Sequence, residues 1–491
     1  MTTSTLDYES RMLIDGELVG AAGGARFDNV NPSTGEVIGS VSDAGPAEME
    51  QAIESARRAF DTTSWSIDRD LRRRCLIQFR DALFAERESL RAELVAELGC
   101  TITSTYSNRL DLPIDRSFDW PIEMIDAFPW ERDEGSVIVG GRSTSRRVRK
   151  EAMGVIGAII PWNSPIELAL AKVIPALATG NTVVLKPAPD TPFSATRIAR
   201  AAAATELPAG VLNIVLSSDH LLGEQLSTDP RVDMISFTGS VETGRRIMSV
   251  GGPTLKRLQL ELGGKSPHVV LDDADLVSAL PLFTSVCLNA GQSCGALSRL
   301  LIPRSRYDET VELLVEAFRA VQVGPPEASS SQLGPLVSGR QRERVLGYIE
   351  QGKASGARML VGGGIPSDLP DGFYVEPTLF VDVDNGSRIA QEEIFGPVLS
   401  VIPYEGDDEA VGLANDSPYG LLAAVSSASE ERAMAIAGRI RAGAVAVNQG
   451  SVFARDVPFG GYKQSGIGRQ NGLEGFEEML ETKTIGIGDA A

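Results

Sequence analysis

The chain of 491 residues is poor in the side chains that most often carry metal or disulfide chemistry. It has two histidines and four cysteines, and it contains no Cys-x-x-Cys pair. Four scattered cysteines are too few for a disulfide framework and are typical of a reducing compartment. Two histidines argue against a structural zinc site, so no metal is predicted. They also argue against a papain-like protease, whose thiolate needs a paired imidazole.

Long apolar runs and excess positive charge are also lacking. The longest apolar run, from Gly154 to Pro161, is far shorter than the roughly 20 residues of a membrane span. The net charge of −20 opposes contact with phosphate backbones and anionic lipid. The polar N-terminus has no basic-then-apolar signal pattern. The sequence therefore predicts a cytoplasmic protein that binds neither nucleic acid nor membrane.

Strand-like and helix-like segments alternate regularly from residue 153 onward. Such alternation predicts an α/β protein with two doubly wound, mostly parallel sheets. We assign residues 1–135 and 153–262 to a first domain and 263–469 to a second. A hairpin in 136–152 interrupts the alternation, and the segment 470–491 ends in a strand without a sequence neighbour. These two ranges are predicted to form a separate small β arm.

Two helices in this scheme bear on the location of a site. Residues 108–130 are predicted to be helical and carry aromatic residues, which either pack in the core or line a substrate entrance. A second helix is predicted over 275–289, and a short run of small and polar residues, Asn289 to Gly295, follows it.

Cys294 lies in that run, in the octet Leu-Asn-Ala-Gly-Gln-Ser-Cys-Gly. Small neighbours keep a sulfur atom accessible, and Gly291 and Gly295 let the backbone bend close to it. These are the requirements of an exposed nucleophile. The alternative is a buried, inert cysteine, which is the commoner fate of a free cysteine.

Two features resemble a dinucleotide site. The segment Phe237 to Gly244 follows a strand and opens a helix, so its amides are placed to face a pyrophosphate. Lys186 ends a strand, at the edge of a parallel sheet where ligands bind. The alternatives are an ordinary glycine-containing turn and an ordinary lysine at the end of a strand.

Three polar residues stand in turns where catalysis or structure explains them equally well. Glu261 ends an apolar strand, and partial burial would raise its pKa towards that of a general base. Asn163 lies in a tight loop and would donate to an oxyanion or simply cap the turn. Glu393, with Phe395 close by, would bind ribose hydroxyls beside a flat ring.

These motifs, in this order, closely resemble the aldehyde dehydrogenase superfamily, of the NAD(P)-dependent, non-acylating type. The resemblance covers nearly the whole chain, from Asn31 to Thr484. The motifs that carry it are Pro161-Trp-Asn-Ser-Pro, Lys186-Pro-Ala, Phe237-Thr-Gly-Ser, Glu261-Leu-Gly-Gly-Lys, Gly291-Gln-Ser-Cys, Glu393-Ile-Phe-Gly-Pro and Pro458-Phe-Gly-Gly-Tyr-Lys-Gln-Ser-Gly.

The resemblance implies oxidation of an aldehyde to the carboxylic acid. Cys294 would attack the aldehyde carbon, and Asn163 with the Cys294 backbone N–H would hold the oxyanion. Loss of hydride to the nicotinamide would leave a thioester, which water hydrolyses with Glu261 as base. Lys172 matches a family lysine near the active site whose role stays open. The resemblance also makes the first domain the dinucleotide-binding domain and the second the catalytic domain.

The cofactor implied is NAD, bound by residues that the family motifs identify. Lys186 and Glu393 would contact the two ribose regions, and Ser240 the pyrophosphate. The full set is Ile160, Pro161, Trp162, Lys186, Gly239, Ser240, Leu262, Glu393 and Phe395. Many NAD-dependent members carry a glutamate at the position of Pro189, so the absence of that carboxylate makes NADP a candidate as well. The family also implies a homodimer or homotetramer joined through the β arm.

Alternatives to this function stay open on the sequence. A CoA-acylating semialdehyde dehydrogenase is the nearest, but transfer to CoA does not need a water-activating base such as Glu261. A catalytically idle scaffold and a cofactor-independent thiol esterase are further alternatives. The substrate beyond its aldehyde group is not predicted. Candidate channel residues are Phe118, Trp120, Trp162, Phe453 and Phe459. Arg455 is either a site for an acidic tail or, as we favour, a surface residue.

Overall fold

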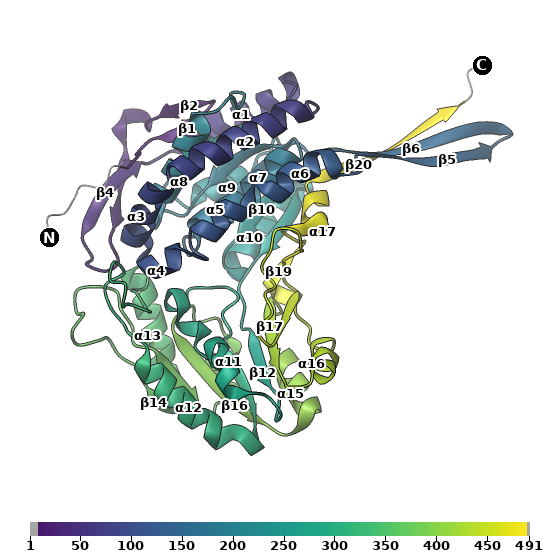
Figure 1. The fold of residues 1–491 in the computed structure, drawn as a ribbon. Coiled ribbons are helices and arrows are strands. Elements are labelled where there is room, and N and C mark those ends of the chain that lie inside the picture. The colour runs from purple at the N-terminus through teal and green to yellow at the C-terminus, as the bar shows by residue number, and fades with distance from the viewer. Residues whose placement is uncertain (1–7, 489–491) are drawn as a thin grey trace.

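Two open β-sheets covered by helices and a projecting three-stranded arm make up the molecule (Figure 1). The computed structural model describes residues 8–488, so the ends of two predicted ranges, 1–7 and 489–491, lie outside the described residues. The predicted α/β class, with two mostly parallel sheets and a small β arm, is confirmed. The domain boundaries assigned from the sequence stay a prediction.

The first sheet has eight strands, of which the central five are parallel. In spatial order they are β19 (Gly466–Ile467), β11 (Arg257–Glu261), β10 (Met234–Thr238), β7 (Val155–Ile159), β8 (Thr182–Lys186), β9 (Leu212–Ile214), β1 (Met12–Ile14) and β2 (Glu17–Val19). The continuous apolar run of β7 is typical of a strand covered on both faces. The sheet takes β19 from residues assigned to the second domain, so the chain returns to it late.

The second sheet has seven strands, and all but the edge strand β14 are parallel. In spatial order they are β14 (Arg358–Val361), β15 (Thr378–Val381), β16 (Val398–Tyr404), β13 (Arg299–Pro303), β12 (Pro267–Val270), β17 (Leu422–Ser426) and β18 (Ala444–Val447). A separate buried apolar cluster lies under each large sheet.

Helices flank both sheets. A separate two-stranded ribbon is formed by β3 (Arg26–Val30) and β4 (Val37–Ser42). With the first sheet lie α1 (Pro46–Thr62), α2 (Arg69–Ala85), α3 (Arg87–Leu98), α4 (Ile102–Thr105), α5 (Asp111–Ser117), α6 (Asp119–Ala127), α7 (Pro165–Ala178), α8 (Pro192–Ala203), α9 (Leu221–Thr228) and α10 (Val241–Gly251). The later helices are α11 (Leu276–Phe283), α12 (Tyr307–Ala320), α13 (Gly339–Ala354), α14 (Arg388–Gln391), α15 (Gly406–Asn415), α16 (Glu430–Ala437) and α17 (Gly472–Glu477).

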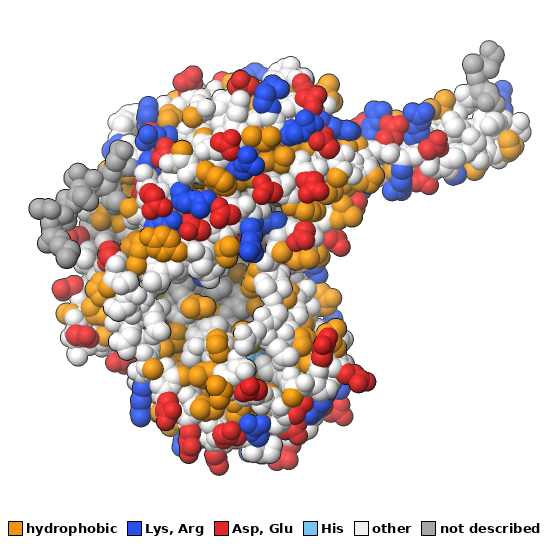
Figure 2. All heavy atoms as spheres, viewed as in Figure 1, with side chains coloured by type: hydrophobic (Ala, Val, Ile, Leu, Met, Phe, Trp, Pro, Cys, Tyr) orange, Lys and Arg blue, Asp and Glu red, His pale blue; other side chains and the backbone are white. Residues whose placement is uncertain are grey.

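The arm joins segments that are far apart in the sequence. The strands β5 (Glu131–Val139) and β6 (Arg142–Ala152) form a hairpin around Gly140-Gly141, and β20 (Leu480–Gly488) pairs antiparallel with β6. The arm extends away from the body and exposes acidic and basic side chains along its length (Figure 2). Ile138 and Val139 are also exposed on it, at 72% and 64%.

Two elements differ from the sequence prediction. The predicted helix over 108–130 is two short helices, α5 and α6, and the chain then enters β5. The predicted helix over 275–289 ends at Phe283 and is followed by a 3-10 segment, Ser285–Gly291, in which Asn289 and Ala290 take left-handed conformations with φ of 51° and 53°. L-residues rarely adopt this region, so the strained turn replaces the last helical turn.

The carboxyl ends of the first sheet's parallel strands face the amino ends of the second sheet's strands. At the carboxyl ends of the first sheet's parallel strands lie Lys186, Thr238 and Glu261. Cys294 and Glu393 precede β13 and β16, at the amino ends of the second sheet's strands. The described face is hollowed between the two parts (Figure 2). The carboxyl edge of the first sheet, where ligands bind in such folds, therefore faces the loop that carries Cys294.

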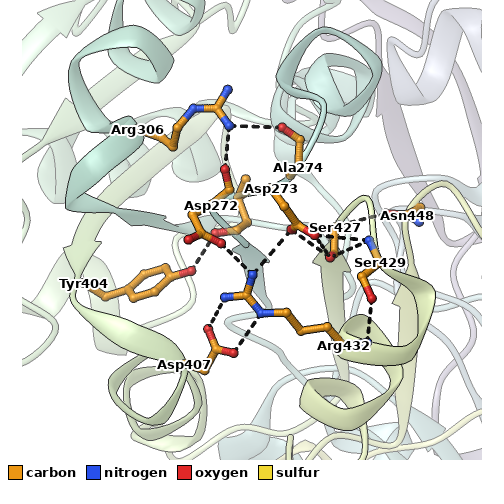
Figure 3. A network of polar contacts seen from close by, with 11 residues as sticks. Asp272, Asp273, Ala274, Arg306, Tyr404, Asp407, Ser427, Ser429, Arg432 and Asn448 are labelled. Atoms are coloured by element: carbon orange, nitrogen blue, oxygen red, sulfur yellow. Dashed lines mark hydrogen bonds and ion pairs between the residues drawn. The ribbon is translucent and has the colours of Figure 1, made fainter.

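The opposite edge of the second sheet is tied by its own side chains (Figure 3). Arg432 donates from Nε and Nη2 to the Asp407 carboxylate, at 3.0 and 2.6 Å, and from Nη1 to Asp272 at 2.5 Å. Ser427 donates to Asp273 at 2.8 Å. These residues follow β12, β16 and β17, so ion pairs occupy the carboxyl edge of this sheet.

Within residues 8–488, no helix is both long and apolar enough to cross a bilayer. In the same range, no cluster of three or more histidine, cysteine, aspartate or glutamate side chains has the arrangement of a metal site.

Candidate active site

Cys294 lies on a backbone segment that only small side chains permit. Three consecutive residues before it, Asn289, Ala290 and Gly291, have positive φ, and a Cβ on Gly291 would lie 2.0 Å from the Gly396 carbonyl oxygen. A Cβ on Gly264 would lie 2.4 Å from the Cys294 carbonyl oxygen. The loop is therefore pressed against the two neighbouring segments, and this contact fixes where the sulfur lies.

Side-chain amides hold the loop from within. Asn289 donates to the carbonyls of Asn163 and Gln292, at 3.2 and 3.3 Å. Gln292 donates to the Asn289 carbonyl at 3.0 Å and accepts from the Val337 N–H at 2.8 Å. Asparagine tolerates the left-handed conformation better than most residues, which explains its presence at this turn.

Asn163 and Cys294 line the same cavity, and their predicted catalytic roles stay a prediction. Asn163 is 6% exposed and donates from Nδ2 to the Gln292 carbonyl at 3.0 Å. One of its two amide hydrogens is therefore left for another acceptor. Among residues 8–488, no acceptor takes the Cys294 backbone N–H. Two donors thus remain free beside the sulfur.

Cys294 differs from the other three cysteines in accessibility. It is partly exposed, whereas Cys75, Cys100 and Cys287 are buried. Burial of the sulfur site, together with the carboxylates of Glu393 and Glu261, raises the pKa of the Cys294 thiol to about 12. The thiol is therefore neutral in the free protein, and its ionisation requires a group that takes the proton.

Glu261 ends β11 and is 3% exposed. Neither carboxylate oxygen has a hydrogen-bond partner among the described residues. Desolvation raises the pKa of Glu261 to about 8, although the charges of Lys172 and Arg469 oppose the rise. A carboxyl group in this state takes up a proton readily near neutral pH.

Lys172 lies on α7 at the head of a buried polar chain. Its Nζ donates to Ser236 Oγ at 3.0 Å, and Ser236 donates to Gln259 Oε1 at 2.6 Å. Gln259 in turn donates to the Arg469 carbonyl at 2.6 Å. Complete burial lowers the pKa of Lys172 to about 7, and the charge of Glu261 opposes the fall. The side chain is fully buried, interacts with the charge of Glu261, and does not line the cavity described below.

The predicted dinucleotide turn lies at the amino end of α10. Ser240 is the N-cap, and its Oγ accepts from the Thr243 N–H at 3.1 Å. A Cβ on Gly239 would lie 2.4 Å from the Phe237 ring, and Gly239 donates to the Glu261 carbonyl at 3.0 Å. The turn therefore presents backbone to the surface beside Glu261.

Lys186 is a cation without a protein partner in the described range. It is 5% exposed, and no hydrogen bond or ion pair of its Nζ exists within residues 8–488. Burial lowers its pKa to about 8, against the charges of Asp219 and Asp43. Ile160, next to it, donates its N–H to the Lys186 carbonyl at 3.2 Å. An acceptor from a ligand would satisfy this lysine.

The Glu393 loop forms the other wall. Glu393 accepts from the Gly264 N–H at 3.1 Å, and burial raises its pKa to about 7. Phe395 has a left-handed φ of 63°, and its ring meets Trp162 edge to face at 5.4 Å. Of the other predicted cofactor residues, Pro161 is partly exposed and Leu262 is buried against α10.

A cavity of about 240 Å³ opens beside Cys294, and Lys186 is not among its lining residues. Of the predicted channel residues, Phe453 and Phe459 line it, but Phe118 and Trp120 do not. Phe118 is fully buried against Phe79, and Trp120 packs on Phe476, so the channel prediction is wrong for these two.

Arg455 lines the same cavity with 12% of its side chain exposed, so the surface alternative is wrong. Three other polar residues line the cavity and were not predicted as channel residues from the sequence: Arg109, Glu167 and Gln470. They lie outside the family motifs, and no local pattern distinguishes an arginine at a cavity from one in solvent. Trp162 does not line this cavity and contacts Phe395 instead.

Comparison with known proteins agrees with this geometry. The sequence model described as "Aldehyde dehydrogenase family" matches residues 19–485. The chain belongs to the aldehyde dehydrogenase family. It is 41% identical over 488 residues to the 3-succinoylsemialdehyde-pyridine dehydrogenase of Pseudomonas sp, covering 98% of each chain. The prediction of an oxidoreductase of this family is confirmed.

Solved structures of family members have the same fold. The Staphylococcus aureus betaine aldehyde dehydrogenase in complex with NAD+ has a TM-score of 0.94 and 35% identity, over 98% of this chain and 95% of that one. The P. syringae AldA indole-3-acetaldehyde dehydrogenase, a cysteine-to-alanine mutant in complex with NAD+ and IAA, has a TM-score of 0.93 and 39% identity, over 98% and 97%. Another S. aureus structure carries a cysteine modified by BME.

In this aldehyde dehydrogenase family chain, we expect Gly264→Ala to displace the Cys294 loop. The new Cβ would lie 2.4 Å from a backbone oxygen, which cannot move without the loop. The rate of Cys294 modification by a small alkylating reagent should change, and aldehyde turnover should fall by about 100-fold or more. Gly347→Ala, on an exposed position of α13 with open space around it, is the matched control. Equal turnover in both variants would contradict the expectation.

Proposed function

We propose that the protein oxidises an aldehyde to the free carboxylic acid with NAD, with Cys294 as the nucleophile. One observation carries this proposal. The partly exposed Cys294 lines a cavity together with Asn163, and both the Asn163 amide and the Cys294 backbone N–H have a hydrogen free to donate. The carboxylate of Glu261 has no hydrogen-bond partner among the described residues, and its charge contributes to the raised pKa of Cys294. A nucleophile, two oxyanion donors and a base are the parts that this reaction needs.

The first step is attack of the Cys294 sulfur on the aldehyde carbon. The thiol proton leaves to a base, and the carbonyl oxygen becomes an oxyanion in a thiohemiacetal. The Cys294 N–H and the second Asn163 amide hydrogen are the donors free to bind it. A single donor of this kind contributes about 100- to 1,000-fold to the rate. Hydrogen bonds from Asn289 and Arg109 to the Asn163 carbonyl, both at 3.2 Å, hold that residue in place.

The cofactor residues fit a dinucleotide. The Lys186 ammonium has no partner among the described residues. Gly239 brings the backbone of the turn to the amino end of α10, and the Glu393 carboxylate can accept further hydrogen bonds besides the one from Gly264. Lys186 and Glu393 would bind ribose hydroxyls, the α10 turn a pyrophosphate, and Phe395 would lie beside a flat ring. NAD, when bound, supplies the hydride acceptor.

The last step is hydrolysis of the Cys294 thioester. Glu261 takes a proton from water, which then attacks the acyl carbon and releases the acid and the thiol. The positive charge of Lys172 limits the rise in the pKa of Glu261. This base favours release of a free acid over transfer to CoA, because transfer to a thiol does not require an activated water.

The names of the relatives leave the substrate open. The enzymes named above act, by their names, on betaine aldehyde, indole-3-acetaldehyde and a 3-succinoylsemialdehyde pyridine. These compounds share little beyond the aldehyde group. The relatives' complexes with NAD+ support NAD as the cofactor of this chain. A reactive cysteine in a relative supports a cysteine nucleophile.

The β arm supports a homo-oligomer. Its three strands form one layer, and exposed Ile138 and Val139 have no covering element in the described chain. A sheet of this kind, with free edges and exposed apolar residues, is stabilised when a second copy covers it. We therefore propose a homodimer or homotetramer in which the arm contacts another subunit.

Replacing Cys294 with alanine should abolish aldehyde oxidation, with turnover falling by at least about 10,000-fold. Cys287→Ala is the matched control, because that thiol is buried in the second core. NADH absorbance measures turnover, and mass spectrometry of acid-quenched enzyme should find an acyl adduct on Cys294. Full activity of Cys294→Ala would refute the mechanism.

Thioester hydrolysis should depend on pH through Glu261. The raised pKa of about 8 means that the carboxyl group is protonated and inactive as a base at lower pH. The hydrolysis rate should therefore fall about tenfold for each pH unit below that value and level off above it. Pre-steady-state NADH formation separates this step from acylation. In Glu261→Gln the initial burst should remain while the slow phase loses its pH dependence; a slow phase that keeps the wild-type profile would exclude Glu261 as the base.

Pro189 should permit some use of NADP. It lies in the turn after β8, close in sequence to Lys186, where a carboxylate would repel a 2′-phosphate. Pro189→Glu should raise the ratio of kcat/KM for NAD to that for NADP by about 10-fold or more. Pro189→Gln, which adds a neutral side chain of similar size, is the control and should change the ratio much less. An equal change in both variants would show that charge at this position does not decide the preference.

A further inference from the structure

The cavity beside Cys294 is positively charged in a strongly acidic protein. Its wall carries three arginines, Arg109, Arg116 and Arg455, and one acidic residue, Glu167. The whole chain has a net charge of −20. Between these polar groups the wall is apolar, with contributions from Leu112, Leu168, Phe453 and Phe459. A wall of this composition is suited to a ligand with an apolar middle and an anionic end.

Arg109 enters the cavity without an acidic partner. Its Nη1 donates to the Asn163 carbonyl at 3.2 Å and to Ser164 Oγ at 2.5 Å. Within residues 8–488, its Nε and Nη2 groups have no acceptor, and no carboxylate lies within ion-pair distance. Burial lowers the pKa of Arg109, with the charge of Glu167 among those that oppose the change. The guanidinium therefore retains donors for a ligand.

Arg455 is held in the same wall by weak contacts. Its Nη1 donates to Asn471 Oδ1 at 3.2 Å, and its Nη2 lies 3.5 Å from Glu167 Oε1. Glu167 is itself 37% exposed, so solvent competes for that carboxylate. A ligand carboxylate would bind the planar guanidinium with two parallel hydrogen bonds, which is a stronger contact than the one it has.

Gln470 supplies an independent sign of a missing acceptor. This residue is 4% exposed, lines the cavity, and its Nε2 has no hydrogen-bond partner among the described residues. Burying an amide donor without a partner is unfavourable, because the donor loses its hydrogen bond to water. An acceptor group on a bound ligand would remove that cost, as it would for the free donors of Arg109.

We propose that the cavity selects aldehydes that carry a carboxylate at the end remote from the aldehyde group, bound by Arg109 and Arg455. This inference rests on the proposed function, since it takes the aldehyde to react at Cys294. The apolar side chains would contact the carbon skeleton between the two ends. A cationic tail would meet two arginines in a poorly solvated cavity and be repelled.

Three benzaldehydes that differ only in the para substituent test the charge preference. The enzyme is assayed with NAD and with benzaldehyde, para-carboxybenzaldehyde and para-(trimethylammonio)benzaldehyde. Charge-assisted hydrogen bonds of this kind change affinity by about 10- to 100-fold. We expect kcat/KM to be highest for the carboxylate by at least about 10-fold over benzaldehyde, and lowest for the cation. A carboxylate that is used no better than benzaldehyde would overturn the inference.

Variants then locate the effect. In Arg455→Leu, the ratio of kcat/KM for para-carboxybenzaldehyde to that for benzaldehyde should fall about 10-fold or more, mainly through KM. Arg455→Lys, which keeps the charge, should retain part of the preference. Arg74→Leu is the control: it removes the same charge from an exposed site on α2, where Arg74 pairs with Glu206, and should leave the ratio unchanged.

The outcomes separate this inference from the proposed function. An unchanged ratio in Arg455→Leu would reject Arg455 as the recognition residue. If that variant does not fold, the order of the three aldehydes with the wild-type enzyme still decides the charge preference. Oxidation of benzaldehyde without a preference for the carboxylate would refute only the inference. Failure to oxidise any of a panel of aromatic, aliphatic and semialdehyde compounds would refute the proposed function itself.

Discussion

The close approach of three backbone segments between the two sheets is the constraint on which the site depends. A Cβ on Gly263 would lie 2.4 Å from a Glu393 carboxylate oxygen, and one on Gly264 would lie 2.4 Å from the Cys294 carbonyl oxygen. A Cβ on Gly291 would lie still closer, 2.0 Å from the Gly396 carbonyl oxygen. Because no side chain separates them, the ends of one sheet's strands and the loops before the other's are held at fixed positions. Glycines are needed at these positions because the segments approach too closely for a side chain, and conformational freedom alone would not explain them.

The same meeting of sheets leaves ionisable groups without solvent. Glu261 and Lys186 are almost completely buried, and neither has a hydrogen-bond partner in the described chain. Each such group costs stability, so its presence indicates a site selected for chemistry. The network around Arg432 shows the contrast (Figure 3), because there every charge drawn has a partner of opposite sign or a hydrogen bond. Ion pairs close the carboxyl edge of the second sheet, whereas the carboxyl edge of the first sheet holds Glu261 and Lys186 without partners among the described residues.

Sequence reasoning reached the fold class because alternation of strands and helices depends on local patterns. It failed where tertiary contacts decide. The strand β17 has the sequence Leu-Ala-Ala-Val-Ser, which is short and rich in alanine, so no strand was predicted for this interior position between β12 and β18 of the second sheet. Asn289 and Ala290 continue a helical pattern, yet they take left-handed conformations just before Gly291, which lies against the Gly396 segment.

The candidate site shows the same division. Cys294, Glu261 and Asn163 stand in motifs that a family resemblance identifies, and the structure brings their neighbourhoods together. Arg109, Arg455 and Gln470 stand in no motif, because residues that recognise a substrate vary with the substrate. Phe118 and Trp120 were wrongly predicted to line the channel, because the sequence alone does not show whether an aromatic residue on a helix faces the core or a cavity. Only the folded chain distinguishes a core ring from a channel ring.

The charge of the cavity follows from how the chain supplies its walls. Arg109 lies just before α5 and reaches the loop that holds Asn163, while Arg455 comes from a segment far along the chain. The two arginines therefore lie on separate elements, and each is fixed by neutral contacts to Ser164 or Asn471. If their role were structural, a buried carboxylate would be the expected partner, as Glu93 is for Arg197. Arg109 has only neutral partners among the described residues, and the one acidic partner of Arg455 is the 37% exposed Glu167 at 3.5 Å, so neither guanidinium charge is fully cancelled. This arrangement leaves the charge available to a ligand, and it lies beside the side chain that we propose as the nucleophile.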